Sequence, residues 1–244
     1  MRVPRLFVSV PIQPNATLIL PEANARHLIT VLRRKEGDPL QVFDGSGLEC
    51  EACVKSISKR RTEIAVQASL DLNLESPLKI TLAQGIAKSD KMDWIIQKAV
   101  ELGVSSIQPL FTDRTVVRLD EKRIEKRLIH WQGVSISATE QCGRNILTPI
   151  HSPVSLKEWF ASRTADSQGM ILHPGSASRL SELKIHVARP LDLLIGPEGG
   201  LSPDEREQAV LQGFYAVRLG PRIMRTETAS IAALGQIQAL WGDI

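Results

Sequence analysis

Residues 191–205 read LDLLIGPEGGLSPDE, and residues 217–230 read VRLGPRIMRTETAS. In both stretches an apolar run of strand character ends at a glycine-rich turn, and a helix pattern follows the turn. A buried strand that leads through a tight turn into a helix is typical of a mostly parallel sheet covered by helices. The two stretches therefore predict an α/β fold.

The first of these turns also indicates what kind of ligand it suits. Ser202 has the character of an N-cap, Pro203 of the first helical position, and Asp204 and Glu205 of an acidic first turn. A helix start that is already electronegative is a poor site for a phosphate, and the chain contains neither a Walker pattern nor G-x-G-x-x-G after a strand. Closely spaced glycines instead let backbone groups approach a neutral adenine or ribose. A phosphate-free adenosine ligand fits this pattern, although a tight strand-to-helix turn explains the glycines equally well.

Further strand and helix patterns alternate before these turns. We expect strands at residues 79–86, 106–112, 169–173, 191–195 and 214–219, with a helix after Ser89 that Gly103 closes and a longer one leading to residues 140–144. Ligands of parallel sheets bind at the carboxyl ends of the strands. The candidate site therefore comprises residues 173–175, 196–200 and 220–225.

The first seventy residues have a different character. Residues 5–69 alternate short strand patterns with one helix, expected near residues 22–32, which predicts a small β-barrel or rolled sheet. The polar segment DLNLESP, residues 71–77, lacks periodicity and ends in a proline. We place a domain boundary there, giving an N-terminal domain of residues 1–72 and a second domain of residues 73–244.

Composition excludes several classes of protein. The chain has 244 residues and a net charge of +3. Its three cysteines are few and odd in number, which indicates a reducing compartment rather than a disulfide framework. Cys50 and Cys53 are three residues apart on a predicted strand, so their thiols should face opposite sides, and no second Cys or His pair completes a zinc site. We expect no metal, no membrane span and a cytoplasmic location.

Basic residues cluster near the N-terminus. Two groups, residues 33–35 and 59–61, have few acidic neighbours, while a third around residues 122–127 alternates with glutamates and resembles a solvated face. Clustered cations contact nucleic-acid phosphates with an affinity that weakens in salt, so this charge permits a nucleic acid as partner without requiring one. The candidate nucleic-acid contacts are Arg2, Arg5, Arg33, Arg34 and Lys35.

The final helix pattern is unusual because no charged residue occurs between Thr228 and Trp241. A helix that is apolar and rich in small residues all round is buried on most sides. A terminal helix ordinarily keeps one face in water, so the pattern predicts that a second subunit covers it and that the chain forms a homodimer.

Taken together, IGPEGGLSPDE and LGPRIMRTETA closely resemble the signature of the ribosomal RNA small subunit methyltransferase E family, which belongs to the SPOUT class. The likeness extends over the whole chain, through residues 5–7, 27–38, 91–104 and 140–144. It implies a PUA-like N-terminal barrel, a SPOUT-type α/β domain with a C-terminal trefoil knot, and an obligate dimer. It also implies methylation of uridine N3 in 16S rRNA of the small ribosomal subunit, with S-adenosyl-L-methionine as the methyl donor.

This chemistry suggests roles for particular residues. The N3 of uracil is an imide N–H, so a base or an environment that favours the anion must act before or during transfer. Glu140 and Glu198 are candidate bases, although a carboxylate between glycines can simply accept backbone N–H groups. Arg144 could steady a uracil oxygen or bind a phosphate, and an ion pair with Glu140 is the equal alternative. The expected cofactor contacts are Leu172, His173, Pro174, Ile195, Gly196, Pro197, Gly199, Gly200, Leu219, Gly220, Ile223, Met224, Arg225, Thr226 and Ala229.

Three other functions stay open at this stage. Another SPOUT enzyme could act on the ribose 2′-oxygen or on transfer RNA, and local chemistry alone does not distinguish it. A non-catalytic RNA-binding protein whose α/β domain only forms dimers would differ by failing to bind S-adenosylmethionine. An NAD-dependent enzyme is disfavoured by the missing dinucleotide fingerprint.

Overall fold

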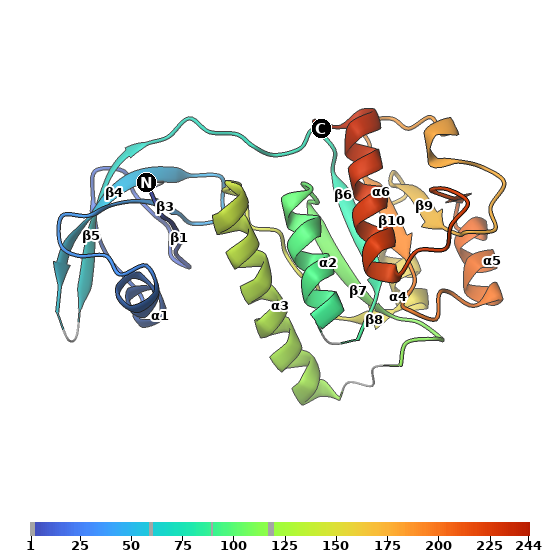
Figure 1. Cartoon of the computed structure of the whole chain (residues 1–244), viewed down its shortest axis with the longest axis horizontal. Helices are drawn as coiled ribbons and strands as arrows, with labels where there is room; N and C mark the ends of the chain where they lie inside the picture. The colour runs from blue at the N-terminus through green and yellow to red at the C-terminus, as the bar shows by residue number, and fades with distance from the viewer. Residues whose placement is uncertain (1–2, 59–60, 89, 117–119) are drawn as a thin grey trace. The chain divides into compact units, whose positions relative to one another are not determined.

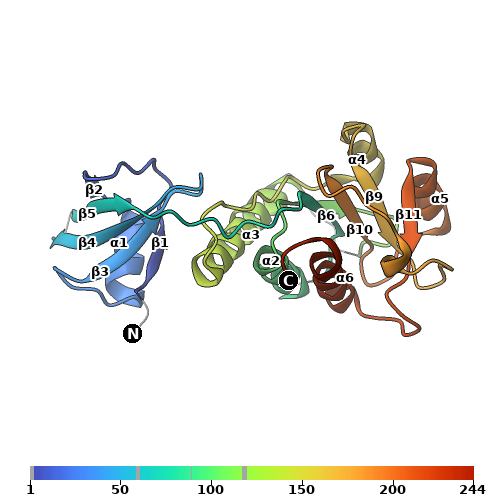
Figure 2. The ribbon, with the colours of Figure 1, turned by 90° about the horizontal axis from the view of Figure 1, so that it is seen from above.

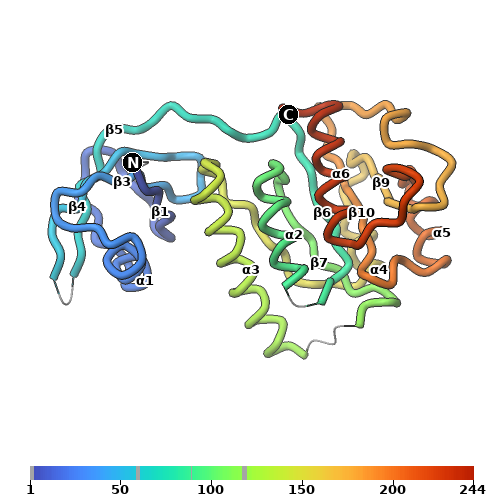
Figure 3. Tube along the Cα trace, viewed as in Figure 1, coloured from blue at the N-terminus to red at the C-terminus, as the bar shows by residue number. Residues whose placement is uncertain are grey.

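The computed structural model describes residues 3–58, 61–88, 90–116 and 120–244, and the path of the chain can be followed in Figures 1 and 3. The chain divides into two compact units. Unit 1 comprises residues 1–75 and 139–147, and unit 2 comprises residues 76–138 and 148–244. Residues 139–147 therefore group with the N-terminal unit, whereas the sequence had placed them in the second domain.

Unit 1 is built on a five-stranded sheet with the order β1-β3-β4-β5-β2. Strand β1 pairs with β3 in parallel, and the other neighbours are antiparallel. Every second residue along the long strands β4 and β5 tends to be buried, as expected for a sheet with one covered face. Val54 of β4 and its cross-strand partner Ile64 of β5 lie in the same core cluster. The strands are β1 (Arg5–Phe7), β2 (Thr17–Ile19), β3 (Pro39–Phe43), β4 (Glu49–Ile57) and β5 (Thr62–Ser69).

The expected helix of unit 1 is present but changes its hydrogen-bond pattern. It begins as α1 (Glu22–Arg26) and continues as a π-helical turn over His27–Val31. Short π-helical turns occur frequently at functional sites.

Unit 2 contains a six-stranded sheet with the order β11-β9-β10-β6-β7-β8, in which every neighbouring pair is parallel. All five residues of the central strand β10 are buried, because helices cover both faces of the sheet. The predicted parallel α/β sheet is thus confirmed. Its strands are β6 (Ile80–Gly85), β7 (Ser106–Phe111), β8 (Val154–Ser155), β9 (Gln168–Leu172), β10 (Leu191–Ile195) and β11 (Phe214–Val217).

Helices of unit 2 pack on opposite faces of this sheet, as Figure 2 shows for α2 and α6 on one side and α4 and α5 on the other. Leu193 lies in the core cluster beneath α2 and α6, while its neighbour Leu194 lies in the cluster beneath α4 and α5. This alternation follows from the period of two along a strand. The helices are α2 (Asp90–Glu101), α3 (Glu121–Cys142), α4 (Leu156–Ser162), α5 (Pro203–Leu211) and α6 (Thr226–Trp241), with a short 3-10 turn at Leu180–Glu182. The end of α3, residues 139–142, belongs to unit 1.

The helix signals confirmed by the structure are local ones. Ser202 caps α5 by accepting from the backbone N–H of Glu205, whose carboxylate in turn accepts from the N–H of Ser202. Pro203 occupies the first turn as expected. Gly103 follows α2 with φ of +77°, and the proposed cap Ser89 lies outside the described residues.

Candidate active site

The two glycine turns line one cavity at the carboxyl edge of the unit 2 sheet. Its volume is about 260 Å³, and residues from the ends of β9, β10 and β11 and from the start of α6 surround it. The lining comprises residues 172–174, 195–200, 217–220 and 222–224, together with Thr226 and Ala229. The carboxyl-edge rule therefore located the cavity from sequence alone.

Most of the expected cofactor contacts line this cavity. Arg225 is the exception: it is exposed and occupies the N-cap position of α6. Three lining residues were missed, namely Val217, Arg218 and Arg222. The signal for the first two was their place at the end of β11, and Arg222 lies inside the turn that had already been identified.

A buried glutamine hydrogen-bonds both to the first glycine turn and to the start of α6, the helix that follows the second turn. Gln84, at the end of β6, is fully buried, and its amide nitrogen donates to the carbonyl of Gly196 over 3.3 Å and to Thr226 Oγ1 over 3.1 Å. Thr226 Oγ1 donates to the same carbonyl over 2.7 Å, and Ser230 Oγ donates to Gln84 Oε1 over 2.7 Å. A satisfied buried network of this kind fixes its members in one arrangement. The sequence offered no signal for it.

The first turn also passes very close to β6. A Cβ atom added to Gly85 would lie 2.5 Å from Cδ of Pro197, and one added to Gly196 would lie 2.8 Å from the backbone of Gly200 and Leu201. Both contacts are shorter than real Cβ atoms permit. Glycine is therefore required here by the close approach of two backbone segments.

Glu198 is the candidate base that lines the cavity. Its Oε1 accepts from the backbone N–H of Lys88 over 3.1 Å and lies 3.3 Å from Nζ of Lys91, which is also 3.7 Å from Glu227. Burial by itself would raise the pKa of Glu198, but these backbone donors and the ammonium of Lys91 bring the pKa below its usual value. The carboxylate is therefore ionised at neutral pH and is a weak proton acceptor.

His173 lines the cavity beside the glycine turns. Burial lowers the pKa of its imidazole, and the positive charge of Arg206 lowers it further. The ring is consequently neutral at physiological pH, which suits an uncharged ligand group.

The helix start next to the cavity carries an acidic capping box, which disfavours a phosphate there. Glu205 accepts from the N–H of Ser202 with one oxygen and from the N–H of Asp113 with the other. This arrangement completes the capping box that the sequence predicted. The N-terminus of α5 is thus closed by its own side chains.

The other two candidate catalytic residues, Glu140 and Arg144, belong to unit 1. Glu140 Oε1 accepts from the backbone N–H of Phe7 over 2.9 Å, and burial raises the pKa of this carboxyl against the smaller opposing effects of that bond and of nearby cations. Arg144 is nearly fully buried, and its Nε donates to Glu75 over 3.0 Å. The ion pair anticipated for Arg144 is present, but its partner is Glu75 and not Glu140.

Arg5 requires a correction to its expected role as an RNA contact. Its guanidinium forms a bidentate pair with the buried Glu49, and its remaining N–H groups donate to the carbonyls of Thr139, Glu140 and Arg144. All five donors are used inside unit 1, so none is left for a phosphate. Arg5 instead ties residues 139–147 to the sheet of unit 1, which explains why that segment belongs there.

The expected RNA contacts at residues 33–35 lie at the surface of unit 1 just after the π-helical turn. Arg33 and Lys35 are exposed, and Arg33 has φ of +52°, an unfavourable conformation for a residue other than glycine. Strained backbone of this kind is concentrated at functional sites. Arg34 is half-buried, and its Nε has no hydrogen-bond partner among the described residues.

The remaining basic positions are less informative. Arg2 and residues 59 and 60 lie outside the described residues, and Arg61 pairs with Glu63. The cluster at residues 122–127 is largely exposed on α3, in agreement with a solvated face.

No helix of the described ranges combines the length and the apolar character that a membrane span needs. The same residues contain no group of three or more His, Cys, Asp or Glu side chains able to hold a metal ion.

Comparison with known proteins agrees with this architecture. Residues 74–238 match the family model of the RNA methyltransferase domain, and residues 20–67 match that of the RNA methyltransferase PUA domain. A SPOUT-type methyltransferase domain preceded by a PUA-like domain is thus the class of protein that the fold and the cavity define.

Individual relatives cover the full chain. The ribosomal RNA small subunit methyltransferase E of Buchnera aphidicola (subsp. Acyrthosiphon pisum) is 34% identical over 99% of this chain and 95% of its own, and that of Bacillus subtilis is 32% identical over 95% of each. The crystal structure of the enzyme of the same name from Neisseria gonorrhoeae, bound to S-adenosyl methionine, superposes with a TM-score of 0.93 at 37% identity over 100% of both chains. The chain belongs to the ribosomal RNA small subunit methyltransferase E family. The trefoil knot stays a prediction.

Proposed function

We propose that this protein transfers a methyl group from S-adenosyl-L-methionine to N3 of a uridine in 16S rRNA of the small ribosomal subunit. The observation that carries the proposal is the single cavity formed by the two glycine turns at the carboxyl edge of the sheet. Its support is the full-length similarity to enzymes named for the small-subunit rRNA, one of them solved with S-adenosyl methionine bound.

The cavity suits the cofactor in three ways. The glycines of the two turns line it without side chains, burial and Arg206 lower the pKa of the His173 imidazole, and the start of α5 carries an acidic capping box that disfavours a phosphate. The residues that would hold the adenosine and methionine parts are those lining the cavity. The cofactor supplies an activated methyl group when it is bound, so the protein must mainly position the acceptor and remove one proton.

The proton on uracil N3 requires an acceptor or an environment that stabilises the anion. Glu198 lies in the cavity but has a lowered pKa, so its contribution is electrostatic and positional more than basic. Glu140 has a raised pKa, which makes it the stronger proton acceptor of the two. We therefore assign the base role first to Glu140, with Glu198 as the alternative and Arg144 as the candidate cation in unit 1.

The exposed basic turn of unit 1 is the proposed site of RNA backbone contact. Arg33 and Lys35 present their charges to solvent, and the strained turn fixes where they project. Such contacts give an affinity that falls as salt is added, and the target base must leave its stack to react.

We also propose a homodimer formed through α6. Its uncharged, partly exposed stripe consists of residues three or four apart, and it adjoins Trp94 of α2, which is 55% exposed. The stripe residues are Thr228, Ile231, Ala232, Gly235 and Ala239. Small residues allow another helix to approach closely, and an exposed apolar surface beside a tryptophan is typical of a protein interface.

One experiment separates this function from its rivals. Purified protein is incubated with labelled S-adenosylmethionine and either small ribosomal subunits or transfer RNA, and the methylated nucleoside is identified by mass spectrometry. N3-methyluridine formed in the small-subunit RNA supports the proposal. A 2′-O-methylated product or methylation of transfer RNA supports another SPOUT activity, and a failure to bind S-adenosylmethionine in calorimetry supports a non-catalytic RNA-binding dimer.

A further inference from the structure

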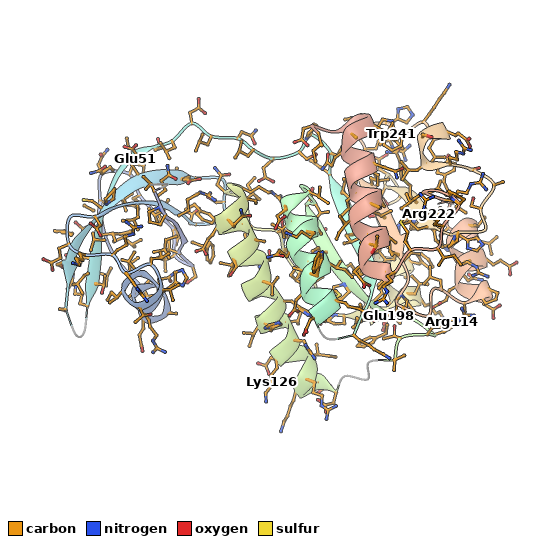
Figure 4. The ribbon with its side chains drawn as sticks, viewed as in Figure 1. Glu51, Arg114, Lys126, Glu198, Arg222 and Trp241 are labelled. Atoms are coloured by element: carbon orange, nitrogen blue, oxygen red, sulfur yellow. The ribbon has the colours of Figure 1, made fainter. Side chains whose placement is uncertain are left out.

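An arginine outside the cavity lining lies next to the first glycine turn. Arg114 follows β7 at the carboxyl edge of the unit 2 sheet, and its Nη1 donates to the carbonyl of Gly199 over 2.9 Å. Figure 4 labels it close to Glu198, although the two residues come from different loops. Its side chain is exposed, so it stands at the rim of the cavity and not inside it.

The backbone beneath Arg114 is held in place from two sides. Within the loop, the N–H of Thr112 donates to Thr115 Oγ1 over 3.0 Å. The N–H of the adjacent Asp113 donates to Glu205 over 2.9 Å, and its carboxylate accepts from Ser202 over 2.6 Å. A side chain on such a base starts from a fixed position, which reduces the entropy lost when it binds a partner.

The charge of Arg114 is uncompensated by the described residues. Its Nε and Nη2 make no hydrogen bond with them, and no carboxylate among them lies within ion-pair distance. The nearby Lys91, in contrast, is paired with Glu198 and Glu227. An exposed guanidinium whose Nε–Nη2 edge is free of partners among the described residues, fixed beside a site that receives RNA, has the geometry that recognises a phosphate.

Resting on the proposed function, we infer that Arg114 binds a backbone phosphate next to the target uridine and so positions that nucleotide over the cofactor cavity. A phosphate fits the rim better than the base does, because the base must enter the cavity while its backbone stays at the edge. The bond to Gly199 then couples the RNA contact to the turn that forms part of the cavity.

The test compares Arg114→Ala and Arg114→Lys with wild-type protein. We expect Arg114→Ala to lower kcat/KM for RNA by about 10- to 100-fold, the loss of a charge-assisted hydrogen bond, while the Kd for S-adenosylmethionine changes by less than about twofold. The plot of log RNA affinity against log salt concentration should become less steep by roughly 0.7, the contribution of one phosphate contact on a single strand. Arg114→Lys should keep that slope, because its charge is retained. Lys126→Ala, which removes an exposed charge from α3 in the same unit, is the matched control and should leave both quantities unchanged.

Two results would overturn the inference. An unchanged RNA affinity and salt slope in Arg114→Ala would show that no phosphate is bound there. A weakened cofactor affinity with an unchanged salt slope would show that the residue only supports Gly199. A wild-type protein that binds RNA without methylating it would refute the proposed function, yet the salt slope would still decide whether Arg114 contacts the RNA.

Discussion

The close approach of β6 to the first glycine turn makes Gly85→Ala a sharp perturbation of the site. The added Cβ would lie 2.5 Å from Cδ of Pro197 where an ordinary contact needs 3.4 Å or more, so one segment must move by about 0.9 Å. Neither neighbour can rotate away, because the contacted atoms belong to a proline ring and to the backbone. Overpacking of this kind costs roughly 1–3 kcal/mol.

The displaced segment is the turn that lines the cavity, so the cost should appear mainly in cofactor binding. We expect the Kd for S-adenosylmethionine, measured by calorimetry, to rise by about tenfold or more. A displacement near 1 Å can also reduce turnover by on the order of 100-fold. The thermal midpoint should fall by no more than about 2–4 °C for each kcal/mol that is borne by the fold itself.

Gly133→Ala supplies the control. Gly133 lies in α3, and an added Cβ there would meet no atom within 4 Å. The substitution should raise helix stability by up to about 1 kcal/mol and leave cofactor affinity unchanged. If Gly85→Ala binds the cofactor as tightly as wild type and melts at the same temperature, the argument from close approach is refuted.

Three further predictions concern dimerisation, unit 1 and pH. Ala232→Arg places a charge in the uncharged stripe of α6 and should yield a monomer in sedimentation velocity without loss of helix content; an unchanged dimer would show that the interface lies elsewhere. Arg144→Ala breaks a largely buried pair with Glu75, so we expect a cost of about 3–5 kcal/mol in denaturant unfolding and reduced turnover with intact cofactor binding; unchanged turnover would remove Arg144 from the mechanism. Because the pKa of Glu198 is lowered in the folded protein, its ionised form stabilises the native state above the ordinary glutamate value of about 4.3, and this contribution is lost as the pH falls below that value. The stability difference between wild type and Glu198→Gln should therefore be largest near neutral pH and should shrink in acid, and a difference independent of pH would contradict the interpretation.

Local chemistry predicted the parts of the fold that depend on neighbours in sequence. The capping residues Ser202 and Pro203 and the closing Gly103 each act within a few positions of themselves, so their patterns are readable without a structure. The cavity followed from a rule about strand ends that applies to any parallel sheet.

The features that sequence reasoning missed depend on partners far along the chain. Gln84 bonds Thr226, which is 142 residues away, and Arg5 bonds the carbonyl of Thr139, which is 134 residues away. The sequence does not show whether a glutamine or an arginine will bond to a distant residue of the chain or to water. Arg5 consequently resembled an RNA contact in a basic cluster, although its donors are all used internally.

The return of residues 139–147 to unit 1 has a practical consequence for exchanging parts between relatives. A fragment cut at residue 72 would leave the Arg5–Glu49 pair without the three carbonyls that complete its hydrogen bonding. A chimera that keeps unit 1 intact must therefore transplant two separate pieces of sequence. Since Arg5, Glu49 and the segment they anchor act together, we expect them to be inherited as a set.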